Sequence, residues 1–264
     1  MSVARVLTST TSHKREPLLP TLEVFARLDL RDIDLNLYHI LERGTSVESV
    51  AAALETHELR LRVVSGGWCD FFHRAPTIDE TYASVSRQVA IARQLGVEQL
   101  RLFFGRLSCD AYSPTHRDVA ADNLSRLSDL YPRTAFVVEN HDGATLRPEV
   151  CREILERVDR PNVRMNFDPI NFERAGVTAM AALDTLRAFV GHVHLKGLEH
   201  GQYCGFGEGD VDLTPMLRSL IGQGYQGGFS VEYEGKNDAT VRLYRSVRRA
   251  ESVLGPLFAA APNP

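Results

Sequence analysis

The stretch Ala135-Phe136-Val137-Val138-Glu139-Asn140-His141 is a short apolar run that ends abruptly in polar and ionisable side chains. β-Branched and aromatic residues favour strands, and a short apolar run bounded by polar residues is typical of a buried strand. Similar runs recur at 163–167, 190–195 and 229–233, with longer segments of helical period between them. This repetition predicts parallel strands joined by helices.

The whole chain follows the same alternation. Between the apolar runs, residues such as Ile78, Tyr82, Val85 and Val89 recur at three- and four-residue steps, which predicts helices with one apolar face packed outside the strands. Two helix starts are predicted, one from Ser46 with Ser49 and one from Thr77 and Glu80, which have the spacing of a capping box. The eight predicted strands are 3–7, 33–37, 59–64, 100–104, 135–138, 163–167, 190–195 and 229–233.

The length favours one domain. The chain has 264 residues, close to the roughly 250 that one eight-unit α/β barrel takes. No Pro-, Gly- or Ser-rich linker interrupts it, so we expect a single domain over 1–258 and a disordered tail over 259–264. A doubly wound sheet would usually carry a Gly-rich phosphate loop after its first strand, whereas 8–12 reads TSTTS here. A closed (β/α)8 TIM barrel is therefore the predicted fold.

Composition excludes several classes of protein. A formal net charge of −4, with 30 Lys and Arg against 34 Asp and Glu, gives no basic excess for binding nucleic acid. The four cysteines form no CxxC pair, which indicates reduced thiols and a cytoplasmic location. No apolar run approaches the roughly 18 residues of a membrane helix, and no secretory signal is recognisable. We expect a cytoplasmic protein that binds neither nucleic acid nor membrane.

Ionisable side chains stand at the carboxyl ends of the last four predicted strands: Glu139, Asp168, His194 and Glu232. Successive members are 29, 26 and 38 residues apart, each about one strand-helix unit. The active sites of such barrels lie at this end of the strands, so barrel closure would bring the four into one ring. Alternatively, each carboxylate caps a helix or pairs with an arginine.

A cation is the physical reason to group these residues. Three carboxylates in one cavity repel one another and are costly to keep ionised unless a positive charge lies between them. Three oxygen ligands and one nitrogen suit Mn²⁺ foremost, then Mg²⁺, Co²⁺ or Zn²⁺. The ring therefore predicts one divalent metal ion bound by Glu139, Asp168, His194 and Glu232.

Several stretches carry a resemblance to a known family. They are VENHDG at 138–143, NFDPIN at 166–171, HVHLK at 192–196, GEGDVD at 207–212 and SVEYEG at 230–235. Together they resemble the xylose isomerase-like sugar phosphate isomerase/epimerase family, over nearly the whole chain. The resemblance implies a TIM barrel with one divalent cation on the four ligands named above. It also implies a small-molecule substrate that is a sugar, an inositol-like polyol or a related hydroxy-ketone.

The family holds several activities, so the resemblance does not choose among them. Its ketose epimerases carry a histidine three residues after the metal aspartate and an arginine six after the metal histidine, where this chain has Asn171 and His200. Members of the family often have an aspartate directly after the lysine that corresponds to Lys196, whereas this chain has Gly197. The apurinic endonucleases need more metal-binding histidines and a basic groove, which the charge balance does not supply.

The predicted reaction is proton abstraction next to a carbonyl, through an enediolate. Glu139 and Glu232 would face each other across the substrate as catalytic residues, one removing the proton and the other returning it. This predicts an isomerase or epimerase. The alternatives are a lyase or dehydratase that eliminates a β-leaving group on the same metal, and a non-catalytic sugar-binding subunit. A homo-oligomer or a partner subunit is compatible with the sequence.

Further residues are predicted to contact substrate. Trp68 and His73 stack on a sugar or else plug the barrel mouth, and Arg101 faces the cavity or else reaches a helix carboxylate. His141 lines the pocket or bonds a loop carbonyl. Lys196 holds a negative charge or pairs with a ligand carboxylate. Three others complete the set: Asn171, which orients Asp168 or touches substrate; His200, which donates to substrate or lies on the surface near Glu199; and Glu208, in a glycine-flanked loop that closes over substrate.

Overall fold

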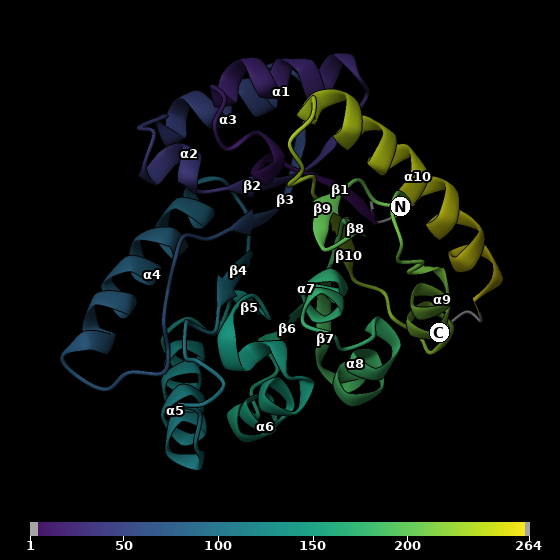
Figure 1. Ribbon diagram of the computed structural model, residues 1–264. Helices are drawn as coiled ribbons and strands as arrows, with labels where there is room; N and C mark the ends of the chain where they lie inside the picture. The colour runs from purple at the N-terminus through teal and green to yellow at the C-terminus, as the bar shows by residue number, and fades with distance from the viewer. Residues whose placement is uncertain (1–4, 262–264) are drawn as a thin grey trace.

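Eight parallel strands close into a barrel in a computed structural model that describes residues 5–261 (Figure 1). Around the barrel the strands follow the order β1, β2, β3, β4, β5, β6, β7, β10, and β10 pairs with β1 to complete the circle. The strands are β1 (Val6–Ser9), β2 (Asp32–Asn36), β3 (Arg60–Ser65), β4 (Gln99–Phe103), β5 (Ala135–Glu139), β6 (Val163–Phe167), β7 (Val190–Leu195) and β10 (Gly228–Val231).

Helices surround the barrel on the outside (Figure 1). They bury apolar stripes against the strands; in α4, Ile78, Val85, Val89 and Ala92 are buried as their spacing predicts. The helices are α1 (Leu18–Arg27), α2 (Tyr38–Leu41), α3 (Val47–Thr56), α4 (Thr77–Gln94), α5 (Pro114–Leu130), α6 (Pro148–Val158), α7 (Pro169–Arg174), α8 (Ala179–Leu186), α9 (Thr214–Gly222) and α10 (Ala239–Ala260), with 3-10 turns η1 (Thr10–His13), η2 (Gly143–Leu146) and η3 (Arg187–Phe189).

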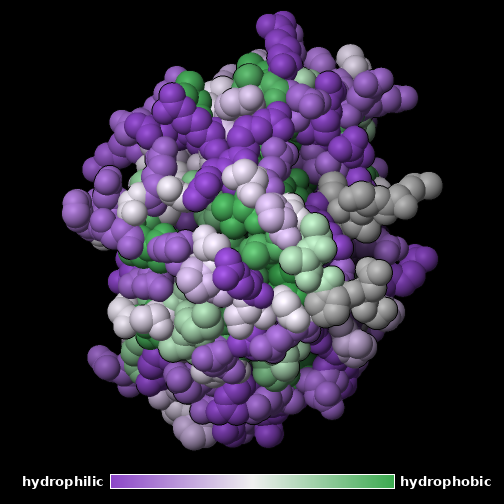
Figure 2. All heavy atoms as spheres, turned by 90° about the vertical axis from the view of Figure 1, so that its right-hand side faces the viewer, coloured by the Kyte–Doolittle hydropathy of each residue, from purple (hydrophilic) through white to green (hydrophobic). Residues whose placement is uncertain are grey.

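The outer surface is polar where the helices meet solvent. The face that carries α9 and α10 is mainly hydrophilic, with a smaller central group of hydrophobic residues (Figure 2). Among residues 5–261, no helix is both long and apolar enough to cross a membrane. All four cysteines are free.

The predicted (β/α)8 TIM barrel is confirmed, with offsets at the ends of elements. The first strand begins at Val6 rather than Val3, and the predicted residues 3 and 4 lie outside the described part of the chain. β10 ends at Val231, so Glu232 follows the strand. The predicted tail at 259–264 is partly wrong, because α10 runs to Ala260; residues 262–264 are not described.

Both predicted helix starts are confirmed, since α3 begins at Val47 and α4 at Thr77, but of these two helices only α3 has a side-chain cap. Ser46 caps α3 and accepts a hydrogen bond from the backbone N–H of Ser49 at 3.1 Å. The capping box predicted from Thr77 and Glu80 is wrong. Pro76 occupies the cap position with helical dihedral angles, so Thr77 is already the first residue of α4, and no side chain caps that helix.

A short hairpin outside the barrel was not predicted. β8 (Gly197–Glu199) pairs antiparallel with β9 (Gln202–Cys204), above the mouth of the barrel. His200 and Gly201 form its two-residue turn, with φ of 48° and 76°. Two consecutive positive φ values characterise the turn that suits the twist of a tight hairpin.

The barrel interior includes a polar layer beneath its mouth. Asp34, Arg101, Asn166, His192 and Ser230 come from five different strands and are all buried. His192 forms a hydrogen bond with Ser230 Oγ through Nε2 at 2.8 Å. Buried polar side chains are costly unless they are paired, so this layer indicates a site above it.

The buried His39 predicts a pH dependence of stability. Its Nε2 lies 3.3 Å from the carbonyl oxygen of Thr10, and burial lowers the pKa of its imidazole. The unfolded chain therefore takes up this proton near about pH 6.5, whereas the folded chain does so only at lower pH. The free energy of unfolding is then highest above about pH 6.5 and falls as the pH drops below it.

We expect His39→Gln to lessen this fall, measured as the difference between urea midpoints at about pH 7.5 and about pH 5. His13, whose pKa burial also lowers, remains in the variant, so the dependence should shrink rather than vanish. His200→Asn, at the exposed hairpin turn, serves as the control and should behave as wild type. An unchanged pH dependence in His39→Gln would contradict this account.

Candidate metal centre

Two of the four predicted ligands are fixed by the ends of β5 and β6. Glu139 is the last residue of β5, and Asp168 caps α7, its Oδ1 accepting from the backbone N–H groups of Ile170 and Asn171 at 3.0 and 3.1 Å. The side-chain amide of Asn140 holds the backbone of Asp168: Nδ2 donates to the carbonyl oxygen at 2.8 Å, and Oδ1 accepts from the N–H at 2.9 Å. Because Oδ1 is used by the helix, Oδ2 is the oxygen of Asp168 that remains for a ligand.

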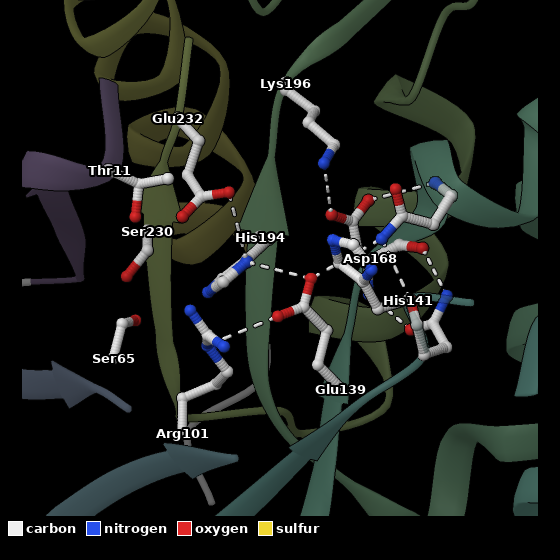
Figure 3. Close-up of polar contacts among 12 residues, drawn as sticks. Thr11, Ser65, Arg101, Glu139, His141, Asp168, His194, Lys196, Ser230 and Glu232 are labelled. Carbon is white, nitrogen blue, oxygen red and sulfur yellow. Dashed lines mark hydrogen bonds and ion pairs between the residues drawn. The ribbon is translucent and has the colours of Figure 1, made fainter. Parts of the chain in front are cut away.

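The imidazole of His194 lies between two of the carboxylates (Figure 3). Its Nδ1 is 3.6 Å from Glu139 Oε1 and 3.4 Å from Glu232 Oε2. Glu232 follows β10 and receives a hydrogen bond on Oε1 from Ser9 Oγ at 3.1 Å. All these side chains are buried. Strands far apart in the chain thus direct acidic and basic groups to one point.

Mutual attraction keeps these groups ionised. Burial opposes ionisation of Glu139, but the charges of His194 and Arg101 outweigh it and lower the pKa of the carboxyl to about 2. The same attraction to His194 outweighs burial at Glu232 and holds its pKa well below the usual value. Burial would lower the pKa of His194, but the two glutamates raise it well above the usual value.

Lys196 forms a second focus of charge at the end of β7. Its Nζ lies 3.0 Å from Asp168 Oδ2 and 2.6 Å from Glu234 Oε1. Burial opposes a charged ammonium, but these two carboxylates raise the pKa of Lys196 well above its usual value. The ring of Tyr203, from β9, packs against the ammonium at 4.3 Å. Lys196 therefore pairs with a predicted ligand carboxylate, the second of the two roles expected for it.

The arrangement fits a divalent cation. Ligand atoms of Glu139, Asp168 and His194 all lie within 4.8 Å of one another. Asp168 Oδ2 and His194 Nδ1 are buried and form no hydrogen bond among the described residues. Their neighbours are charged groups: the Lys196 ammonium lies 3.0 Å from Asp168 Oδ2, and Glu232 and Glu139 lie 3.4 and 3.6 Å from His194 Nδ1. Glu232 adds a fourth donor next to His194. Three carboxylates and one imidazole form a donor set that Mn²⁺, Mg²⁺, Co²⁺ and Zn²⁺ all accept.

Two other predicted residues contact Glu139 directly. Arg101, on β4, places Nε 3.3 Å from Glu139 Oε2 (Figure 3). Asn171 donates from Nδ2 to Glu139 Oε1 at 3.4 Å and to the backbone oxygen of Asn140 at 2.9 Å, and its Oδ1 accepts from Tyr203. Arg101 thus points into the barrel rather than to a helix, and Asn171 orients a ligand carboxylate.

Trp68 and His141 lie on either side of Phe103 at the mouth. Trp68 stacks on Phe103 with ring centroids 5.1 Å apart, and His141 meets the same ring edge-on at 4.8 Å. Trp68 keeps 40% of its surface exposed, and the guanidinium carbon of Arg106 lies over its ring, 4.1 Å from the centroid. His73 is more distant from this cluster and pairs with Asp70 at 3.5 Å.

The structure does not bring His200 or Glu208 to the ring. His200 is 87% exposed in its side chain and pairs with Asp210 at 3.3 Å, at the hairpin turn. Glu208 pairs with Arg242 of α10 at 2.8 Å and accepts from the backbone N–H of Gly205. The glycine-flanked loop around Glu208 is therefore held against α10.

Four residues of the site were not predicted from the sequence: Asp34, Phe103, Tyr203 and Glu234. Asp34 alternates with apolar residues inside a strand, the same signal that identified Arg101. Tyr203 lies on the hairpin that was not predicted. Beside Glu234 is a cavity of about 510 Å³, lined by 11–16 and 233–236. Its volume suits a small molecule.

Comparison with known proteins agrees with the barrel fold. A family model described as xylose isomerase-like TIM barrel matches residues 22–251. The chain is 22% identical over 129 residues to the 3-dehydroshikimate dehydratase of Bacillus anthracis, covering 47% of this chain and 46% of that protein. It is 21% identical over 178 residues to a putative hydroxypyruvate isomerase of Xenopus laevis, covering 62% and 64% of the two chains.

One solved structure has the same fold as this chain over nearly the full length of both proteins. The IolI protein with a bound zinc atom superposes with a TM-score of 0.78 at 17% identity, covering 98% of this chain and all of that one (100%). The two curated relatives above are matched over less than two thirds of their own lengths. At such identities the comparisons establish the fold and leave the reaction open.

Asp168 gives a direct test of the metal centre. We expect wild-type protein to bind about one equivalent of Mn²⁺ and to unfold at a higher temperature with it, since a ligand that binds only the folded state stabilises it. Asp168→Asn, which keeps an oxygen to cap α7, should lose both the metal and the stabilisation. Metal analysis and thermal unfolding with added Mn²⁺ measure these effects.

The control removes a helix cap without touching the ring. Thr178 caps α8 by accepting from the backbone N–H of Ala181. Thr178→Ala should cost about 1 kcal/mol of stability and leave Mn²⁺ binding as in wild type. Retention of the metal by Asp168→Asn would remove Asp168 from the ligand set.

Proposed function

Because the chain belongs to the xylose isomerase-like TIM barrel family, we propose that it is a divalent-metal-dependent isomerase or epimerase of sugars or sugar-like keto-polyols. Glu139, Asp168, His194 and Glu232 would hold the cation, with Mn²⁺ as the favoured ion. The substrate would be a small molecule that enters by the cavity beside Glu234. The cytoplasm is the proposed location.

The observation that carries this proposal is the pair of buried carboxylates around His194. Glu139 and Glu232 approach the same imidazole nitrogen from two strands, at 3.6 and 3.4 Å. A divalent cation bound here would polarise the carbonyl of a hydroxy-ketone and so acidify the adjacent C–H. Two carboxylates on opposite sides of such a carbon can remove a proton from one face and return it to the other.

The neighbouring residues prepare the carboxylates for this role. The low pKa values of Glu139 and Glu232 keep both groups ionised, which is the form that can bind a cation. Arg101 and Asn171 fix the orientation of the Glu139 carboxylate, and Ser9 fixes that of Glu232. Trp68 is 40% exposed and would contact a sugar on the part of its ring that Phe103 and Arg106 leave open. The charged group of Lys196 can stabilise negative charge that develops on a substrate oxygen.

Elimination is the second candidate reaction. The similarity to the 3-dehydroshikimate dehydratase of Bacillus anthracis supports it. The first step, removal of a proton next to a carbonyl, is common to elimination and isomerisation. The two reactions part afterwards, according to whether the substrate carries a leaving group one carbon further on.

Replacing either glutamate should stop proton exchange. We expect Glu139→Gln and Glu232→Gln to fold normally and to lower solvent-deuterium incorporation at the carbon next to the carbonyl by at least about 10²-fold. NMR or mass spectrometry of a panel of ketoses, inososes and keto-glycosides in D₂O measures this. Glu153→Gln, which removes an acid from α6, is the control. Full exchange in both site variants would exclude the two-carboxylate relay.

Product absorbance separates the two reactions. An elimination forms a conjugated enone that absorbs in the ultraviolet, whereas isomerisation or epimerisation leaves the absorbance unchanged. We expect deuterated product without new ultraviolet absorbance, monitored during turnover of whichever substrate in the panel exchanges. A growing enone band would assign the protein to the lyases.

A further inference from the structure

Asp34 is a buried acid that the proposed reaction does not use. It lies on β2, where its side chain is fully buried and Oδ1 accepts a hydrogen bond from Ser65 Oγ at 2.8 Å. Its other oxygen, Oδ2, has no hydrogen-bond partner among the described residues. A buried carboxylate oxygen without a partner is costly, so its orientation needs a reason.

The group that faces Asp34 is His194. Oδ2 of Asp34 lies 3.8 Å from Nε2 of His194, and this nitrogen also lacks a hydrogen-bond partner in the described part of the chain. His192 lies beside this pair: its Nε2 is 2.8 Å from Ser230 Oγ, and a ring nitrogen of His192 lies within 4.8 Å of ligand atoms of Asp34 and His194. Two complementary buried groups therefore stand just beyond hydrogen-bond distance of each other.

The two nitrogens of His194 point in different directions. Nδ1 faces Glu139 and Glu232, whereas Nε2 faces Asp34 on the other side of the ring. A neutral imidazole has one N–H and one lone pair, so binding a cation through Nδ1 requires the proton on Nε2. A carboxylate that accepts this proton in a hydrogen bond fixes both the tautomer and the ring orientation.

We propose that Asp34 is a positioning residue that accepts a hydrogen bond from His194 Nε2 and thereby directs Nδ1 to the cation. This role rests on the proposed metal centre. Ser65 supports it by holding Oδ1, which leaves Oδ2 free to face the imidazole. A displacement of less than an ångström closes the gap from 3.8 Å to hydrogen-bond length.

The experiment compares Mn²⁺ affinity in matched variants by titration followed with electron paramagnetic resonance. We expect Asp34→Ala to weaken binding by about 10- to 100-fold. Asp34→Asn, which keeps an oxygen acceptor and the side-chain shape, should weaken it less. Asp32→Asn is the control on the same strand; Asp32 pairs with Arg60 and Arg62, so this variant should lower stability and leave Mn²⁺ affinity unchanged.

A spectroscopic readout separates positioning from general damage. In the Zn²⁺-loaded wild type, ¹⁵N-resolved NMR of the histidine rings should show the His194 proton on Nε2. Asp34→Ala should give a mixture of tautomers or lose that signal, whereas Asp32→Asn should retain it.

Each outcome decides between the two proposals. If wild type binds Mn²⁺ tightly and both Asp34 variants bind it with the wild-type affinity, the positioning role is overturned and the metal centre stands. If wild type binds two equivalents of metal and Asp34→Ala binds one, Asp34 is itself a metal ligand, and this result also overturns the positioning role. A wild-type protein that binds no Mn²⁺ overturns the metal centre, and the role of Asp34 with it.

Discussion

The ring of His194 is where the charges of the barrel mouth meet. Glu139 and Glu232 lie within 3.6 Å of one nitrogen, and Asp34 faces the other. Carboxylates so close together in a buried site cannot all remain ionised without positive charge among them. Arg101 on Glu139 and Lys196 on Asp168 supply part of it. These side chains balance part of the negative charge, and the part that remains is what makes the mouth suitable for a cation.

Barrel closure creates this concentration of charge. Because β10 pairs with β1, the carboxyl ends of all eight strands face the same opening. A flat sheet of the same strands would place Ser9, at the end of β1, far from Glu232, whereas in the barrel they share a hydrogen bond of 3.1 Å. Barrel closure thus lets a residue of the first strand, Ser9, hold a predicted metal ligand that follows the last strand, Glu232.

The sequence predicted the barrel and the ring because both depend on repetition. Each strand end follows an apolar run, so Glu139, Asp168 and His194 could be aligned by their spacing alone. Contacts between side chains of different strands do not follow from this repetition. Asp34 and His194 are 160 residues apart, and only the packed barrel shows that their unpartnered atoms face each other. The failed cap at Thr77 has a local cause, the helical backbone of Pro76, which the pattern of residue types does not reveal.

The hairpin β8–β9 connects the rim of the barrel to its centre. Tyr203 packs on Lys196, donates to Asn171 at 2.9 Å and accepts from Arg174 at 2.6 Å, so one side chain links the end of β7 to two residues of α7. Its turn, by contrast, is exposed and has few ties to the rest of the molecule. The turn can therefore change in sequence or length without breaking the contacts of Tyr203 with Lys196 and Asn171. Such a change would reshape the rim of the barrel and leave the buried acids in place.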